Sequence, residues 1–213
     1  MKLINNFMCS DRMVEHAEKE IRGCLDLLKC CNVIFDIGAN VGVYSCLFAE
    51  IFPNIDIYSF EPVKPTFDLL VRNISHNGFN NVKCFNIGFL SKKTQAYLTL
   101  PKDRNVQNIG LYSVYIKDGK SKVLANFVNL GEWCKENILN PDFIKMDTEG
   151  SELEIINSSA NIIKATRYIM IEENPSFFKN NELQNTLSDW FDIKVTKNRP
   201  QGCSDLVCIN KTL

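Results

Sequence analysis

The stretch VIFDIGANVGVYS, residues 33–45, decides the fold. It begins with a short apolar run, Val33 to Ile37, of the kind that predicts a buried strand. Gly38 allows a tight turn with close backbone approach, and Gly42 allows the next helix to pack near the strand. This order of strand, glycine-rich loop and helix predicts a ligand-binding unit within a parallel sheet.

Predicted strands and helices alternate along most of the chain. We expect further strands at 55–60, 82–87, 143–146 and 168–172, and helices at 11–29, 42–51, 66–77, 131–139, 151–163 and 182–190. Ser151 and Glu154 have the spacing of a helix capping box. Alternation at this spacing predicts βαβ units, hence an α/β fold in which helices cover both faces of a mostly parallel sheet. The runs 191–196 and 205–209 predict an antiparallel strand pair at the sheet edge.

Residues 91–128 have a different character. Short runs at 95–100, 111–116 and 123–128 predict strands joined by polar turns, so we expect an antiparallel insertion or a substrate flap. The region 1–31 is expected to place an N-terminal helix against the domain. With neither an internal repeat nor a linker in the sequence, residues 1–213 are predicted to form a single domain.

Composition excludes several classes of partner. The chain has 24 Lys plus Arg and 25 Asp plus Glu, so it lacks the basic field that attracts nucleic acid or anionic lipid. The nine cysteines include no CxxC pair, which argues against a zinc site and favours reduced thiols. No apolar run reaches the ~18 residues needed to span a membrane, and the start lacks the apolar stretch of a signal peptide. We therefore expect no membrane association and a cytoplasmic location.

Acidic side chains follow the first two predicted strands. Asp36 precedes the glycine loop and fits a cationic ligand better than a pyrophosphate, which needs a helix N-terminus clear of negative charge. S-adenosylmethionine carries an ammonium and a sulfonium and is such a ligand. Glu61, in SFEPV at 59–63, can accept hydrogen bonds from both ribose hydroxyls of an adenosine ligand. NAD enzymes use the same device, so Glu61 alone does not choose the cofactor.

Three more acids follow the later strands. Asp147 and Glu149 lie in FIKMDTEGSELEII at 143–156, and Glu172 lies in IMIEENP at 169–175. Clustered acids are costly unless they bind a positive group or share a proton. Asp147 could hold an ammonium, a metal ion or a proton taken from an acceptor hydroxyl, and Glu149 could do either of the last two. Glu172 could complete an oxygen cluster for a divalent metal such as Mg²⁺, or supply a general base.

These motifs together are familiar. VIFDIGANVGVYS, YSFEPVKPTFDLLVRNISHNG, FIKMDTEGSELEII and YIMIEENP, in this order across 33–175, resemble the FkbM-type S-adenosylmethionine-dependent methyltransferases. The resemblance implies a Rossmann-like sheet of seven strands and O-methylation of hydroxyls on sugars, glycans and other natural products. Family members often have Leu-Asp before the fourth core strand, whereas here Gly131 follows Leu130, which leaves compensation by Glu132 in question.

The resemblance also implies roles for individual residues. The methionine part of the cofactor would contact the first loop, at Asp36, Gly38, Ala39, Asn40 and Gly42. Glu61 would bind the ribose, with Pro62 beside it. The stretch Asn86, Ile87 and Gly88 would lie near the adenine. Asp147 would also touch the cofactor, and together with Glu149 it would face the reaction centre.

The function expected from these residues is transfer of a methyl group to a sugar or glycan hydroxyl, with S-adenosylhomocysteine as the second product. Asp147, Glu149 or Glu172 would act as the base, or these three would hold a metal that lowers the hydroxyl pKa. Three alternatives remain. One is methylation of a hydroxyl on another small molecule or natural product. The second is an NAD-dependent sugar-modifying enzyme, disfavoured by the G-x-N-x-G loop and the lack of a Tyr-x-x-x-Lys pair or a catalytic histidine. The third is a non-catalytic module that keeps the fold to bind a partner, disfavoured by the presence of both cofactor motifs.

Overall fold

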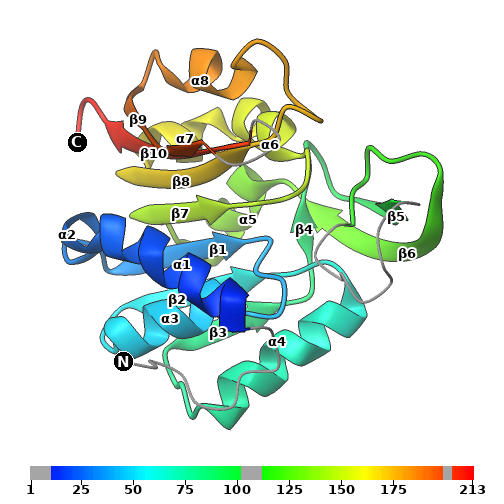
Figure 1. Cartoon of the computed structure of the whole chain (residues 1–213), viewed down its shortest axis with the longest axis horizontal. Helices are drawn as coiled ribbons and strands as arrows, with labels where there is room; N and C mark the ends of the chain where they lie inside the picture. The colour runs from blue at the N-terminus through cyan, green and yellow to red at the C-terminus, as the bar shows by residue number, and fades with distance from the viewer. Residues whose placement is uncertain (1–10, 102–111, 199–202) are drawn as a thin grey trace.

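The computed structural model describes residues 11–101, 112–198 and 203–213. Its main sheet has seven strands in the order β3-β2-β1-β7-β8-β10-β9 (Figure 1). Their bounds are β1 Val33–Ile37, β2 Asp56–Phe60, β3 Val82–Phe85, β7 Phe143–Met146, β8 Tyr168–Glu173, β9 Phe191–Asn198 and β10 Ser204–Asn210. β1, β2, β3, β7 and β8 are parallel, whereas β10 pairs antiparallel with both β8 and β9. The predicted mostly parallel sheet with an antiparallel strand pair at its edge is therefore confirmed.

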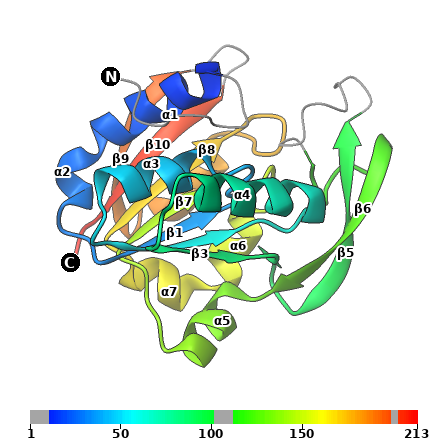
Figure 2. The ribbon, with the colours of Figure 1, turned by 90° about the horizontal axis from the view of Figure 1, so that it is seen from below.

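Helices cover both faces of this sheet (Figure 2). One face carries α1 Asp11–Gly23, α2 Leu25–Leu28, α3 Val43–Ile51 and α4 Lys64–His76. The other carries α5 Leu130–Asn137, α6 Glu152–Ser158, α7 Ala160–Ala165 and α8 Glu182–Leu187. Strand β1 shows why apolar residues are needed on both of its faces, because Ile34 enters the first core while Phe35 and Ile37 enter the second.

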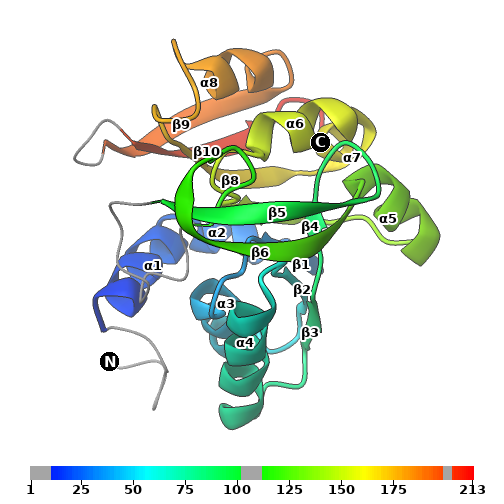
Figure 3. The same cartoon turned by 90° about the vertical axis from the view of Figure 1, so that its right-hand side faces the viewer.

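A second, three-stranded sheet projects from the carboxyl ends of the parallel strands (Figure 3). It consists of β4 Gly88–Phe89, β5 Thr94–Pro101 and β6 Gly119–Val128 in the order β4-β6-β5. We call the described residues 88–101 and 112–128 the flap. A small third core joins the flap to the start of α4. It consists of Leu90, Leu98, Ala125 and Phe127 of the flap together with Val63.

Several local predictions were wrong. No strand forms over the described part of 111–116, where Ser113 makes a single bridge to Thr99 and residue 111 lies outside the described ranges. The helix expected at 151–163 breaks at Ser159 into α6 and α7, and the one expected at 11–29 breaks at Cys24. The third strand ends at Phe85, before the predicted 87, and α8 ends before the predicted 190.

The predicted N-terminal segment is only partly within the described ranges. Of the segment 1–31, the residues before 11 lie outside the described ranges. Within the described part of the chain, none of the helices combines the length and apolar character that a membrane span requires.

Candidate active site

A hollow lies between the flap and the carboxyl ends of β1, β2 and β7. It encloses about 610 Å³ of space free of protein atoms, part of it open to solvent. Three groups of residues line it: the strand ends, the loop after β7 and the inner side of the flap. They are Ile37, Gly38, Asn40, Phe60, Glu61, Pro62, Val63, Gly88, Phe89, Leu98, Tyr112, Phe127, Asp147, Thr148, Glu149 and Ser151.

The glycine loop after β1 forms the floor of the hollow. Gly38 has a φ of +74°, and a Cβ there would lie 1.9 Å from the backbone oxygen of Asp147, so only glycine fits. Gly42 has a φ of +87°, and a Cβ there would lie 2.5 Å from the Leu70 side chain, so the close contact is with α4 rather than with the strand as predicted. Asn40, at a φ of 54°, has a buried Oδ1 without a hydrogen-bond partner in the described structure. A loop whose backbone borders the hollow at Gly38, beside the unpartnered Asn40 oxygen, is suited to a bound ligand.

Glu61 lies at the wall of the hollow and is only 6% exposed. Its Oε1 accepts a hydrogen bond from the Val63 backbone N–H at 2.8 Å, and its Oε2 accepts one from the Asn40 N–H at 3.0 Å. Burial raises the pKa of this carboxyl to about 7, although the two N–H donors oppose the shift. The carboxylate is thus held rigidly, with lone pairs left for a diol.

The three residues expected near the adenine lie only partly at the hollow. Of the three residues 86–88, only Gly88 lines the hollow, and a Cβ there would lie 2.6 Å from the Phe127 ring. Asn86 instead donates hydrogen bonds to the backbone oxygens of Glu61 and Pro62 and braces that turn. Ile87 packs against the second core.

The flap supplies apolar walls that the sequence analysis did not assign. They are the side chains of Phe89, Leu98, Tyr112 and Phe127. For Leu98 and Phe127 the signal in the sequence was alternation along predicted strands of an insertion, which cannot tell a wall of a binding site from ordinary packing.

Asp36 does not line the hollow. It is fully buried beneath the glycine loop, where its Oδ2 accepts a hydrogen bond from the Ser45 hydroxyl at 2.6 Å. Its Oδ1 lies 3.7 Å from the Nζ of Lys145, a buried lysine to which the sequence analysis gave no role. Burial raises the pKa of Asp36, and the Lys145 ammonium opposes this. The signal for Lys145 was its position inside an otherwise apolar strand.

Lys145 connects Asp36 to the loop after β7. Its Nζ lies 3.5 Å from the Asp147 carboxylate and 3.4 Å from the Gly38 backbone oxygen. Burial by itself would lower the pKa of Lys145, but the charges of Asp147 and Asp36 outweigh it and raise the pKa. The lysine is therefore held in its charged form.

The acids expected at the reaction centre are only partly brought together. Asp147, with 38% of its side chain exposed, and Glu149 both line the hollow. Burial raises the pKa of Glu149 to about 9, and the charges of Asp147, Glu172 and Glu152 add to the effect. Glu172 lies outside the hollow, in two smaller adjoining cavities that it shares with Asp147.

The predicted metal cluster of Asp147, Glu149 and Glu172 is not supported. Within the described ranges, the group of candidate ligand atoms that lie within 4.8 Å of one another belongs to His16, Glu20 and Asp205. Asp147 has a lysine ammonium as its near neighbour instead.

Hydrogen bonds tie the flap to the loop after β7 and to α6. The Ser113 hydroxyl donates to the Glu149 backbone oxygen at 2.6 Å, and the Tyr115 hydroxyl donates to Glu154 at 2.6 Å. Glu154 also accepts from the Ser91 N–H, so the expected capping box with Ser151 was wrong and this acid serves the flap. The start of α6 is held by other means, since the Glu152 carboxylate accepts from two N–H groups of the preceding loop.

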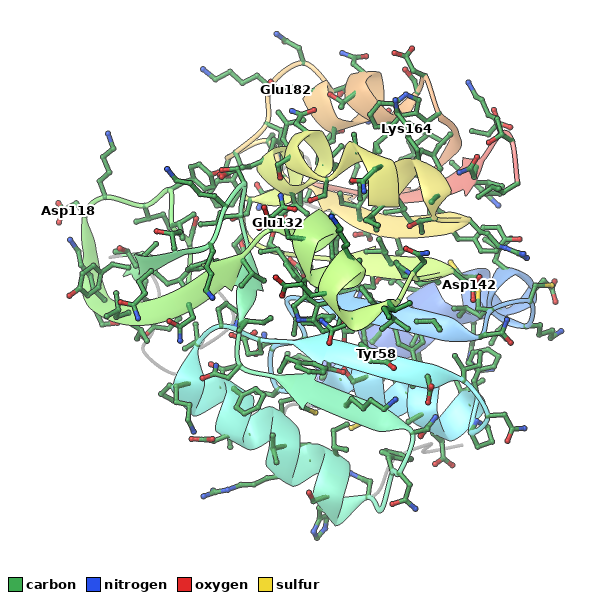
Figure 4. All side chains as sticks on the ribbon, turned by 180° about the vertical axis from the view of Figure 1, so that it is seen from behind. Tyr58, Asp118, Glu132, Asp142, Lys164 and Glu182 are labelled. Carbon is green, nitrogen blue, oxygen red and sulfur yellow. The ribbon has the colours of Figure 1, made fainter. Side chains whose placement is uncertain are left out.

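Glu132 does not take the place of the acid that family members often have before the fourth core strand. It is exposed on α5 and does not line the hollow (Figure 4). Its backbone has a structural role instead, because the side chain of Asn129, three residues earlier, caps α5 by accepting from the Glu132 N–H at 2.9 Å.

Comparisons with known proteins agree with this geometry. The model of the methyltransferase FkbM domain matches residues 36–194. The chain is 24% identical to the hexuronic acid methyltransferase AglP of Haloferax volcanii, over 72% of this chain and 64% of that protein. It is 26% identical to the methyltransferase sdnD of Sordaria araneosa, over 58% of each chain. The chain thus spans less than two thirds of the length of both relatives.

Solved structures share the fold. Magnesium protoporphyrin IX methyltransferase (ChlM) from Synechocystis PCC 6803, solved with bound S-adenosylmethionine, superposes with a TM-score of 0.57 at 13% identity, over 99% of this chain and 88% of that one. The predicted Rossmann-like methyltransferase fold is confirmed. Because the family model covers most of the chain, the resemblance seen in the sequence is also confirmed, and the protein belongs to the methyltransferase FkbM family.

Proposed function

We propose that the protein is an S-adenosylmethionine-dependent O-methyltransferase that methylates a hydroxyl of a sugar or glycan. The observation that carries the proposal is the hollow itself. It combines a floor that admits no side chain at Gly38, the unpartnered Asn40 oxygen and the buried Glu61 carboxylate. This donor set suits an adenosine bearing a positively charged tail.

The residues present fit that cofactor part by part. Glu61 would accept the ribose hydroxyls, and Gly88 with the apolar flap side chains would enclose the adenine. Asn40 and Asp147 would face the methionine portion. When bound, S-adenosylmethionine supplies an electrophilic methyl group on a sulfonium.

Asp147 is the better candidate for the base. Because the pKa of Glu149 is raised to about 9, Glu149 keeps its proton at neutral pH and cannot accept another. Asp147 is partly exposed, and it lines both the hollow and the two adjoining cavities, where an acceptor could reach it. Its role would be to take the proton of the acceptor hydroxyl while the flap excludes water.

A sugar acceptor is supported by one relative. AglP is named a hexuronic acid methyltransferase, and the match covers most of this chain. Membership of a methyltransferase family favours methyl transfer over the alternative of an NAD-dependent enzyme. Methylation of a hydroxyl on another small molecule is the competing proposal, since sdnD is named only as a methyltransferase.

The test is a transfer assay with S-adenosylmethionine labelled in its methyl group. Glycans and nucleotide sugars with free hydroxyls are offered beside non-sugar alcohols and phenols, and labelled products are located by mass spectrometry. We expect label on a sugar hydroxyl, and we expect Asp147→Asn to reduce kcat by about 10²-fold or more. Transfer only to non-sugar hydroxyls would reject the sugar assignment, and failure to bind the cofactor would reject the whole proposal.

A further inference from the structure

We propose that Lys145 is a positioning residue for the methionine end of the cofactor: it holds the Asp147 carboxylate and the Gly38 carbonyl in place at one side of the hollow. This inference rests on the proposed function. It concerns a residue that touches neither the hollow nor, on our assignment, the cofactor.

The placement of Lys145 follows from the sheet. Asp36 of β1 and Lys145 of β7 are register partners on neighbouring parallel strands, so their side chains project to the same face. There the ammonium lies 3.7 Å from Asp36, 3.5 Å from Asp147 and 3.4 Å from the Gly38 oxygen, with the Tyr44 ring 4.7 Å away. One cation therefore joins the glycine loop to the loop after β7.

Stability does not explain this arrangement. The other residues of β7, Phe143, Ile144 and Met146, are fully buried and apolar. An apolar side chain at the remaining position would be the ordinary solution, because a buried ion pair contributes little net stability compared with good apolar packing. Lys145 instead orients two acceptors that border the hollow, the Asp147 carboxylate and the Gly38 oxygen, because its ammonium is a fixed donor between them.

The consequence concerns Asp147 in particular. Asp147 follows the last residue of β7, and its N–H donates to the Ile37 oxygen at 3.0 Å, which fixes the backbone. Its side chain is 38% exposed, so this pairing does not fix the carboxylate. The ammonium restrains the carboxylate, and it also balances negative charge that would otherwise favour protonation of the buried Asp36. Without Lys145, both the carboxylate and the loop oxygen would be free to turn away from the methionine portion.

The experiment compares two ligands by isothermal titration calorimetry. S-adenosylhomocysteine carries the amino-acid portion, whereas 5′-methylthioadenosine has the same adenosine without it. We expect Lys145→Met to weaken binding of S-adenosylhomocysteine by about tenfold or more, the size of one lost charge-assisted contact, and to change binding of 5′-methylthioadenosine less than about twofold. Lys145→Arg, which keeps the charge, should recover most of the lost affinity.

Two further variants make the outcome decisive. Lys145→Met with Asp36→Asn removes the buried cation together with its buried partner, so it should fold even where the single variant does not, and should show the same ligand pattern. Lys83→Met is the matched control, because Lys83 is also a strand lysine near a carboxylate, 3.6 Å from Asp56, but is exposed on β3. It should bind both ligands like the wild type.

Three results would overturn the inference: unchanged affinity for S-adenosylhomocysteine, an equal loss for both ligands, which indicates a merely structural role, or no recovery with arginine. If the wild type binds neither ligand, the proposed function fails instead, so the two failures are distinguishable.

Discussion

Replacing Glu61 by glutamine tests the wall of the hollow most directly. The substitution keeps the shape of the side chain but leaves one acceptor oxygen where there were two. The wild-type carboxylate accepts from the backbone N–H groups of Val63 and Asn40, so the amide must present its NH₂ to one of those donors. The substitution also removes the negatively charged oxygen that would accept hydrogen bonds from the ribose hydroxyls.

The magnitude follows from the pKa of Glu61, which is raised from 4.5 to about 7 by burial. A folded-state pKa above the unfolded value means that the native state binds more protons between these limits, so stability falls as pH rises from about 4.5 to about 7. The shift corresponds to about 3 kcal/mol, which is the stability lost above that window. Glu61→Gln removes this pH dependence. It should also weaken an adenosine ligand by about 1.5–3 kcal/mol, roughly 10- to 150-fold.

Two assays check these expectations. Urea unfolding from pH 4.5 to 8 should show the loss of stability in the wild type and a flatter curve in Glu61→Gln. Calorimetry with S-adenosylhomocysteine at pH 8 should show the weaker binding, with Glu50→Gln, the same change at an exposed residue of α3, as the control. Equal affinity of wild type and Glu61→Gln at pH 8 would refute the assignment of Glu61 to the ribose.

Three further predictions concern the loops around the hollow. Gly38→Ala should lower the free energy of unfolding more than Gly78→Ala in urea titrations, because both glycines have φ near +70° but only Gly38 lacks room for a Cβ. Glu149→Gln should be more stable than wild type at pH 9, because the raised pKa of Glu149 means that its ionisation destabilises the wild type as pH rises. Tyr115→Phe removes the flap's hydrogen bond to Glu154 and should raise KM for the cofactor with a stability cost of about 1 kcal/mol, measured by steady-state kinetics and thermal unfolding.

The parts of the fold that could be predicted from sequence are those set by local pattern. The apolar run at Val33–Ile37 and the run at Phe143–Met146 became strands with the predicted bounds. The described part of the predicted run 111–116 did not form a strand, because pairing is a long-range property and these residues meet β5 in the single bridge from Ser113 to Thr99. Pattern identifies a segment that can pair, but the partner decides whether it does.

In the candidate site too, the residues set by local sequence pattern could be predicted and those set by tertiary packing could not. Gly38, Asn40, Glu61 and Asp147 follow strand ends, so the parallel order of the strands brings them to one edge, as expected. The flap walls and the bracing role of Asn86 depend on tertiary packing, which local sequence patterns do not reveal.

Strand alternation explains why the acids at this edge behave differently from one another. Asp36 lies inside β1, so the pleat directs it into the helix-covered core, where only a buried cation could offset its charge; the register of β1 with β7 supplies Lys145. Asp147 is the first residue after β7 ends at Met146. Its N–H still donates to the Ile37 oxygen at 3.0 Å, but its side chain is partly exposed and borders both the hollow and the adjoining cavities. A carboxylate within a strand is thus fixed and compensated, while one just beyond it retains the exposure that proton exchange requires. The chemistry proposed here therefore depends on the end of the strand: the Asp147 N–H donates to the Ile37 oxygen at 3.0 Å and fixes the backbone, while the side chain keeps the exposure that an accessible base requires.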